Sequence, residues 1–168
     1  YPSHILKRIC RDCLRLDSTD LIGQSLLNDG SNIEQLGNGI NDGASPFGLN
    51  NPSDIALDLV NHRLFATDTN NHRVLIFNLD ITNQIVDRQA DFVLGQPDFY
   101  SYATSTSSSG MNSPNGVEYD AIKNRLYISD TLNNRVLIFD VATITNGENA
   151  INVLGQNTFT TFAATTTI

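Results

Sequence analysis

The stretch that decides the fold of this chain is Asp68-Thr-Asn-Asn-His-Arg-Val-Leu-Ile-Phe77, because it recurs as Asp130-Thr-Leu-Asn-Asn-Arg-Val-Leu-Ile-Phe139. The two stretches lie 62 positions apart, from 68 to 130. The identity extends toward the N-terminus, and the recurring residues of the first copy are Pro52, Asp58, Arg63, Leu64, Asp68, Thr69, Asn71, Arg73, Val74, Leu75, Ile76 and Phe77. Self-similarity at a fixed period indicates a repeat architecture.

A second motif follows each copy. Val93-Leu-Gly-Gln96 returns as Val153-Leu-Gly-Gln156, 60 positions later, so the connecting segment is two residues shorter in the second copy. A surface loop tolerates such a change in length. A third occurrence, Leu21-Ile-Gly-Gln24, precedes the first full copy and looks like the end of an earlier repeat.

Each copy predicts four short strands, because β-branched and aromatic residues cluster in runs that are separated by Asn, Asp and Gly. The third strand is apolar on both faces, with Leu75 and Phe77 alternating with Val74 and Ile76. Such a strand is sandwiched between two layers. Repeated four-stranded antiparallel units are typical of a β-propeller. The expected strands are 54–58, 63–67, 73–79 and 91–95, then 116–120, 125–129, 135–141 and 150–154.

The motifs narrow the kind of propeller. The chain has no Trp, so the WD repeat is excluded, and it has no Gly-Gly signature of the kelch repeat. Residues 112–117 and 130–139 resemble the NHL repeat, which reads Pro-x-Gly-Val and then Asp-Thr-x-Asn-x-Arg-Val-x-x-Phe. The first copy departs at Asp54, where that family prefers Gly. Asn134 of the second copy replaces the family's His, which the first copy supplies as His72.

The resemblance covers residues 50–156 together with the motif at 21–24. It implies an all-β partial propeller with two complete four-stranded antiparallel blades and remnants of flanking blades. We expect a flanking segment at 1–20, the end of a preceding blade with its linker at 21–49, a first blade with its linker at 50–110, and a second blade with a truncated linker at 111–168. Both ends thus fall inside a repeat, which predicts a fragment of a parent protein with about six blades.

The Asp-Thr-x-Asn-x-Arg segment joins the second and third strands. Asp68 is expected to accept hydrogen bonds from backbone N–H groups of the turn, and Asn71 suits a left-handed backbone. Arg73 lies within reach of Asp68 or of the neighbouring blade for a charge-assisted pair. The same structural turn is expected in the second copy, from Asp130 and Arg135.

A cation site is the alternative function of these turns. It would use Asp68 with Asn70, or Asp130 with Asn133, but Ca²⁺ takes six to eight oxygen ligands and each turn offers too few charges. We therefore predict structural turns and no metal site. The chain also holds only three histidines, and no catalytic residue is assigned.

In an up-and-down blade the second-to-third strand turn and the linker to the next blade leave at the same end. This end is the candidate ligand surface, since loops on a rigid scaffold often carry function. The linker at 97–113 is rich in Ser and Thr, and its alternative interpretation is a solvated spacer. The candidate binding residues are Asn70, Asn71, His72, Asn133 and Asn134.

Residues 3–16 break the strand pattern. Apolar side chains fall on one side of a helical projection and basic ones on the other, which predicts an amphipathic helix that flanks and covers an exposed blade, or else binds a membrane or partner. The apolar set is Ile5, Leu6, Ile9, Cys10, Cys13 and Leu14, and the basic set is Lys7, Arg8, Arg11 and Arg15. With His4 alone nearby, the two cysteines lack the ligands of a zinc site, and the sequence leaves open whether they pair.

Composition limits the partners. The 18 acidic residues outnumber the 10 basic ones and give a net charge of -8, which argues against nucleic acid. No apolar run approaches the length of a membrane span, and no signal peptide is present in the chain. Resemblance to NHL propellers slightly favours a secreted or extracytoplasmic location, which the chain itself leaves unknown.

By the same resemblance, the expected function is a non-catalytic binding scaffold for a protein or small ligand, without a cofactor. One alternative is part of a propeller enzyme of the lyase or hydrolase type, since the metal-dependent amidating lyase of peptide hormones uses such a propeller. The other is a structural module that associates with further blades or with copies of itself.

Overall fold

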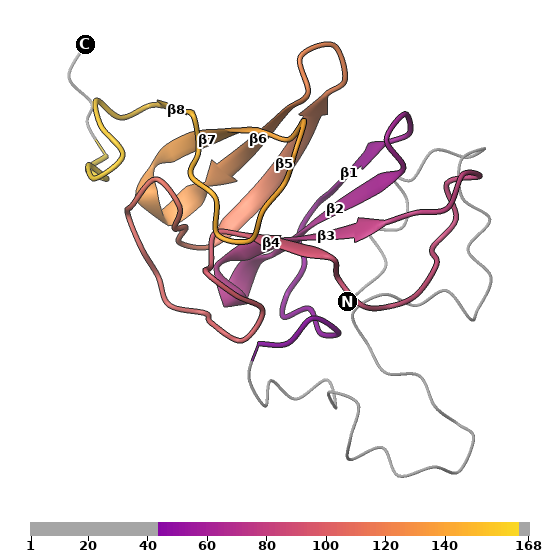
Figure 1. Cartoon of the computed structure of the whole chain (residues 1–168). Coiled ribbons are helices and arrows are strands. Elements are labelled where there is room, and N and C mark those ends of the chain that lie inside the picture. The colour runs from indigo at the N-terminus through magenta and orange to yellow at the C-terminus, as the bar shows by residue number, and fades with distance from the viewer. Residues whose placement is uncertain (1–43, 165–168) are drawn as a thin grey trace, which may run out of the picture.

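The computed structural model describes residues 44–164 and contains two four-stranded antiparallel sheets, each with its strands in sequence order (Figure 1). The sheets are named blade 1 and blade 2. Two short 3₁₀ helices, η3 (Thr69–Asn71) and η4 (Thr131–Asn133), lie in the turns between the second and third strands. The strands are β1 (Ile55–Asp58), β2 (Arg63–Asp68), β3 (Arg73–Asn78) and β4 (Phe92–Leu94), followed by β5 (Pro114–Asp120), β6 (Arg125–Asp130), β7 (Arg135–Asp140) and β8 (Asn152–Leu154).

The all-β fold with two antiparallel blades is therefore confirmed for this part of the chain. The blades lie beside each other, and the β1–β2 and β5–β6 hairpin turns point to the same end, at the top of Figure 1. The fourth strands are shorter than expected. Gly95 and Gly155 follow them with φ angles of 90° and 85°, which lie outside the extended region and end each strand. The predicted N-terminal helix and the remnant of a preceding blade lie outside the described residues.

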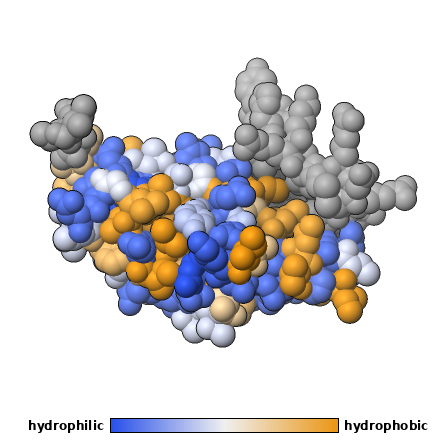
Figure 2. Space-filling view, turned by 90° about the horizontal axis from the view of Figure 1, so that it is seen from above, coloured by the Kyte–Doolittle hydropathy of each residue, from blue (hydrophilic) through white to orange (hydrophobic). Residues whose placement is uncertain are grey.

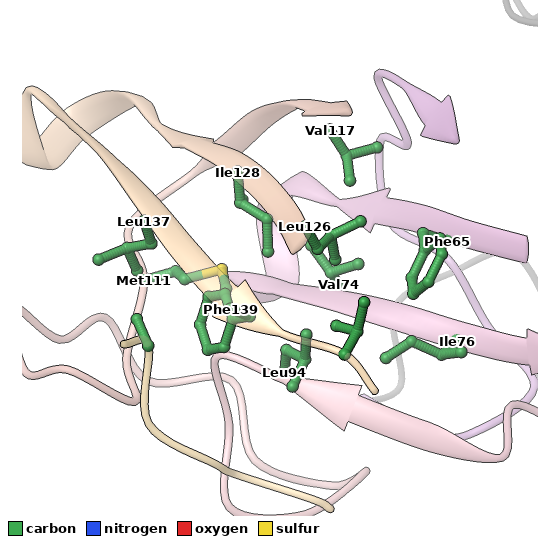
Figure 3. Close-up of a cluster of buried hydrophobic side chains, with 12 residues drawn as sticks. Phe65, Val74, Ile76, Leu94, Met111, Val117, Leu126, Ile128, Leu137 and Phe139 are labelled. Atoms are coloured by element: carbon green, nitrogen blue, oxygen red, sulfur yellow. The ribbon is translucent and has the colours of Figure 1, made fainter. Parts of the chain in front are cut away.

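The main core forms between the two blades (Figure 3). Blade 1 contributes Phe65 and Val74, and blade 2 contributes Leu126, Leu137 and Phe139, all fully buried or nearly so. Val74 and Ile76 of β3 belong to this core, whereas Leu75 and Phe77 belong to a second cluster on the other face of blade 1. The expectation that the third strand is buried on both faces is thus correct for β3. Burying these apolar surfaces is the main stabilising contribution to the pair of blades.

Polar contacts fix how the blades sit against each other. The hydroxyl of Ser53 donates to the carbonyl of Asn115 at 2.8 Å, and the hydroxyl of Thr69 donates to the carbonyl of Pro114 at 2.8 Å. Phe65 stacks on Tyr119 of blade 2 with ring centroids 5.7 Å apart. None of the helices within residues 44–164 has the length and hydropathy of a membrane-spanning segment.

Candidate functional site: the linker face

Asp68 and Arg73 form a fully buried ion pair at the start of the β2–β3 turn. Arg73 Nε lies 2.6 Å from Asp68 Oδ2, and both side chains are 0% exposed. The two residues are cross-strand partners in the β2–β3 ladder, which holds their side chains together. A buried charged pair must also satisfy its remaining donors and acceptors, and the linkers supply the partners.

Arg73 forms hydrogen bonds with the linkers on both sides of blade 1. Its terminal nitrogens donate to the carbonyls of Ser45, at 2.8 Å, and Gly48, at 3.2 Å, in the segment that leads into the blade. They also donate to the carbonyl of Phe99 in the segment that leaves it. The remaining carboxylate oxygen, Asp68 Oδ1, accepts from the backbone N–H of Asn50 at 2.6 Å. One ion pair therefore holds the incoming and outgoing linkers.

Blade 2 repeats this arrangement. Arg135 Nε lies 2.6 Å from Asp130 Oδ2, both again buried. The guanidinium donates to the carbonyls of Ser107 and Gly110 on the incoming side, at 3.0 Å each, and to that of Phe159 on the outgoing side. The Ser- and Thr-rich linker before blade 2 is thus fastened along its backbone, unlike a freely solvated spacer.

Two details of the expected turn are corrected by the structure. Asp68 accepts its backbone hydrogen bond from Asn50 in the linker, 18 residues away, instead of from the turn itself. The left-handed residue is His72, with φ 55°, and not Asn71. Asn71 closes the 3₁₀ helix, and its side chain donates to both oxygens of Asp68. The next residue must then reverse the chain, as Asn134 does in blade 2 with φ 52°.

The predicted binding residues divide into two groups. Asn71 and Asn133 are buried and donate to Asp68 and Asp130, so they belong to the interior of the turns. The other three reach the surface at the same end of the blades: Asn70 and Asn134 are exposed and His72 is half-buried.

His72 links blade 1 to the linker that precedes blade 2. Its Nδ1 accepts a hydrogen bond from the backbone N–H of Ser113 at 3.0 Å, and its carbonyl accepts from the side-chain amide of Gln96 at 3.1 Å. Burial lowers the pKa of His72 below its ordinary value, and the nearby charges of Asp130 and Asp68 oppose that shift. The neutral ring is the form that can accept the Ser113 N–H.

Gln96 and Gln156 have a role that sequence reasoning did not assign. The side-chain amide of Gln96 bridges the carbonyls of His72 and Ala103, and that of Gln156 bridges the carbonyls of Asn134 and Ala163. These bonds hold the outgoing linker against the turn. The signal was present in the recurring Val-Leu-Gly-Gln motif, whose glycine brings the backbone close to the turn.

Exposed aromatic side chains on the outgoing linkers were also missed. Tyr100 is 70% exposed and Tyr102 is 57% exposed, while the carbonyls of the flanking Phe99 and Ala103 are held by Arg73 and Gln96. Phe162 takes the place of Tyr102 in blade 2 and is exposed as well. We call this end of the molecule the linker face: the turns 69–72 and 131–134 with the linkers 95–113 and 155–164.

The opposite end carries a second buried pair, between Asp58 and Arg63. Asp58 accepts from the backbone N–H of Asn61 at 2.9 Å and from the Arg63 guanidinium. Burial alone would raise the pKa of Asp58, but these hydrogen bonds outweigh it and the pKa is lowered. Val60 and Ile122 are exposed in the hairpin turns of this end. Figure 2 looks onto it and shows apolar side chains in separate patches between hydrophilic ones.

Within residues 44–164, no group of three or more His, Cys, Asp or Glu side chains is placed to hold a metal ion. The linker face presents amides, hydroxyls, aromatic rings and the carboxylate of Asp98. Arg73 and Arg135 are buried against their carboxylates.

Two neighbouring four-stranded antiparallel blades define part of a β-propeller. The comparisons with known proteins agree, because residues 49–77 match the family model of the NHL repeat. The matched segment runs from the incoming linker to Phe77 in β3 and includes the Asp68–Arg73 pair. NHL repeats generally mediate protein interactions. No curated protein matches the chain in a sequence search.

Proposed function

We propose that this protein is a non-catalytic binding scaffold whose linker face receives a segment of a partner protein. The observation that carries the proposal is the display of Tyr100 and Tyr102, two exposed aromatic side chains on a linker whose backbone is fastened on both sides. Tyrosine is enriched among the residues that dominate binding energy at protein interfaces.

Fastening of the linker favours binding for a thermodynamic reason. A mobile loop loses conformational entropy when a partner orders it, and that loss opposes association. Here the backbone around the tyrosines is already held by Arg73, Gln96 and Asp98, whose carboxylate accepts the N–H of Tyr100 at 2.8 Å. The face is therefore preorganised, and the exposed amides of Asn70 and Asn134 add hydrogen-bonding groups at the same end.

Charge favours a protein partner over a nucleic acid. The two arginines of the turns are engaged with Asp68 and Asp130 inside the blades, so neither guanidinium is free to contact a phosphate. Asp98 adds a negative charge to the linker, and the pKa of its carboxyl is held low by hydrogen bonds from Tyr100 and Ser101. Electrostatics at this face therefore select against polyanions.

A peptide-display library selected on the full chain tests the proposal. Selected peptides are then measured against a Tyr100→Ser, Tyr102→Ser variant and against a Val60→Ser, Ile122→Ser control, which removes exposed apolar side chains from the hairpin end. We expect the linker-face variant to weaken binding by about tenfold or more and the control to bind like the parent chain. Peptides that bind all three proteins equally would refute the linker face as the binding surface.

A further inference from the structure

Blade 2 presents a sheet face that points away from blade 1, and the strand register defines its side chains. Glu118, Tyr127, Ile138 and Asn152 are successive cross-strand partners from β5 to β8, so they form one row on one face. A second row contains Ser129, Val136 and Leu154. We call these two rows the outer face of blade 2.

The equivalent face of blade 1 is the surface that packs on blade 2. Its first row reads Ala56, Phe65, Ile76 and Phe92, and its second row reads Thr67, Val74 and Leu94. Leu94 is 0% exposed, whereas Leu154 at the same position of blade 2 is 49% exposed. The outer face of blade 2 therefore has the position of an interface without a described occupant.

At its edges, the outer face of blade 2 has polar residues where the equivalent face of blade 1 has apolar ones. Glu118 replaces Ala56 and Asn152 replaces Phe92, although the centre stays apolar with Tyr127 and Ile138. A blade packed in the same way would bring the Glu118 carboxylate to the edge of the interface, where the equivalent Ala56 is only partly buried, and a positive partner would stabilise it there. The face thus fits an occupant with an apolar centre and basic edges, the usual combination of an apolar core and a polar rim.

We propose that residues 3–16 of the same chain dock on the outer face of blade 2. The segment lies outside the described residues, and its sequence has the required chemistry: apolar residues such as Ile5, Leu6 and Ile9 alternate with basic residues at helical spacing. A helix is about 10 Å across and therefore fits on a four-stranded sheet face, whose outer strands lie about 14 Å apart at about 4.8 Å between neighbouring strands.

Charge and chain length support this occupant. The outer face and the row beside it are mainly acidic, with one basic residue, Arg125, and the acidic residues Glu118, Asp120 and Asp140. The segment is mainly basic, with one acidic residue, Asp12, and the basic residues Lys7, Arg8, Arg11 and Arg15. The 27 residues from 17 to 43 can span up to about 90 Å, so the segment can reach any part of the same molecule. Docking would cover Leu154 and place basic side chains beside Glu118. The proposal is independent of binding at the linker face.

Disulfide trapping tests the proposal, because the only two cysteines of the chain, Cys10 and Cys13, lie in the segment. In a Cys13→Ser background of the full chain, Leu154→Cys places a second thiol on the outer face. The matched control is Val60→Cys, a thiol at the exposed hairpin end. Each protein is oxidised at low concentration and mapped by mass spectrometry, and its melting curve verifies folding.

We expect an intramolecular disulfide between Cys10 and the thiol at position 154, formed about tenfold faster than with the control. Equal rates in the two proteins would overturn the proposal. A disulfide-linked dimer would overturn it as well, because a second copy would then occupy the face.

A charge variant provides a second test of docking, which does not depend on the position of the introduced thiol. Glu118→Lys in the trapping background should slow the intramolecular disulfide several-fold, because it repels the basic residues of the segment. Asp87→Lys makes the same charge change in the exposed β3–β4 connection of blade 1 and should leave the rate unchanged. Equal slowing by both variants would show only a general charge effect and would contradict docking on the outer face.

Discussion

Arg63 of blade 1 donates a hydrogen bond across the blade interface to the backbone carbonyl of Val141, at 2.6 Å. Its guanidinium also lies over the rings of Phe65 and Tyr119, 5.6 and 6.0 Å from their centroids, and pairs with the buried Asp58. Arg125, at the same position of blade 2, instead pairs with Asp140 of its own blade, where both side chains are partly exposed. One repeated residue therefore joins two blades in the first copy and makes a surface pair in the second.

Arg63→Gln should lower the free energy of unfolding by about 3–5 kcal/mol, because it leaves the Asp58 carboxylate buried without its positive partner. Arg125→Gln is the matched control and should lower it by about 1 kcal/mol or less, as is usual for exposed ion pairs. Urea denaturation of both variants measures the difference. Equal losses would show that Arg63 contributes no more than a surface residue.

Asp68→Asn should be destabilising by a similar amount, about 3–5 kcal/mol, because the charge of Arg73 would remain in the interior. Asp140→Asn removes the same charge from the partly exposed pair and should change stability by about 1 kcal/mol or less. Thermal and urea unfolding provide the measurement. If Asp68→Asn abolished peptide binding at unchanged stability, the turn would be part of a binding site and not a structural element.

The contribution of His72 to the free energy of unfolding should fall as the pH drops below about 6.5, the ordinary pKa of histidine. The folded-state pKa of His72 is lowered, so its contribution is present above the unfolded pKa and is lost as the pH falls through the folded pKa. Protonation of Nδ1 would also remove the acceptor of the Ser113 N–H. His72→Asn, which introduces the residue found at position 134, should flatten the pH dependence of the melting temperature between about pH 7 and 5.

Gly95→Ala should lower the free energy of unfolding by about 1–3 kcal/mol, because φ at Gly95 is 90° and an added Cβ would lie 2.9 Å from the His72 carbonyl oxygen. Gly48→Ala is the control, since its Cβ would meet only the Ser45 hydroxyl at 3.6 Å, an ordinary contact. The control should stay within about 0.5 kcal/mol of the parent. Comparable losses in chemical denaturation would argue against the close approach at Gly95.

The sequence was sufficient to predict the two blades, because the repeat places apolar runs and turn residues in register. It also predicted the pairing of Asp68 with Arg73, since the two residues recur together at a fixed spacing. It did not reveal that Arg73 binds Ser45, Gly48 and Phe99, because backbone carbonyls are common to all residues and leave no pattern. Similarly, Asn is a residue type that tolerates a left-handed backbone, so the sequence favoured Asn71 for that conformation. Only the hydrogen bond from the Asn71 side chain to Asp68 shows why His72 adopts it instead.

Fastening through main-chain oxygens has a consequence for how this molecule can diverge. Arg73 and Arg135 bind the linkers at equivalent positions, Ser45 and Gly48 in one case and Ser107 and Gly110 in the other. The residues between those positions nevertheless differ, Pro-Phe in the first linker and Ser-Ser in the second. The course of the linker thus depends on main-chain contacts and not on the side chains between them. Side chains at this end of the molecule can therefore change while the frame stays intact, and the same separation makes these linkers suitable sites for grafting new binding sequences.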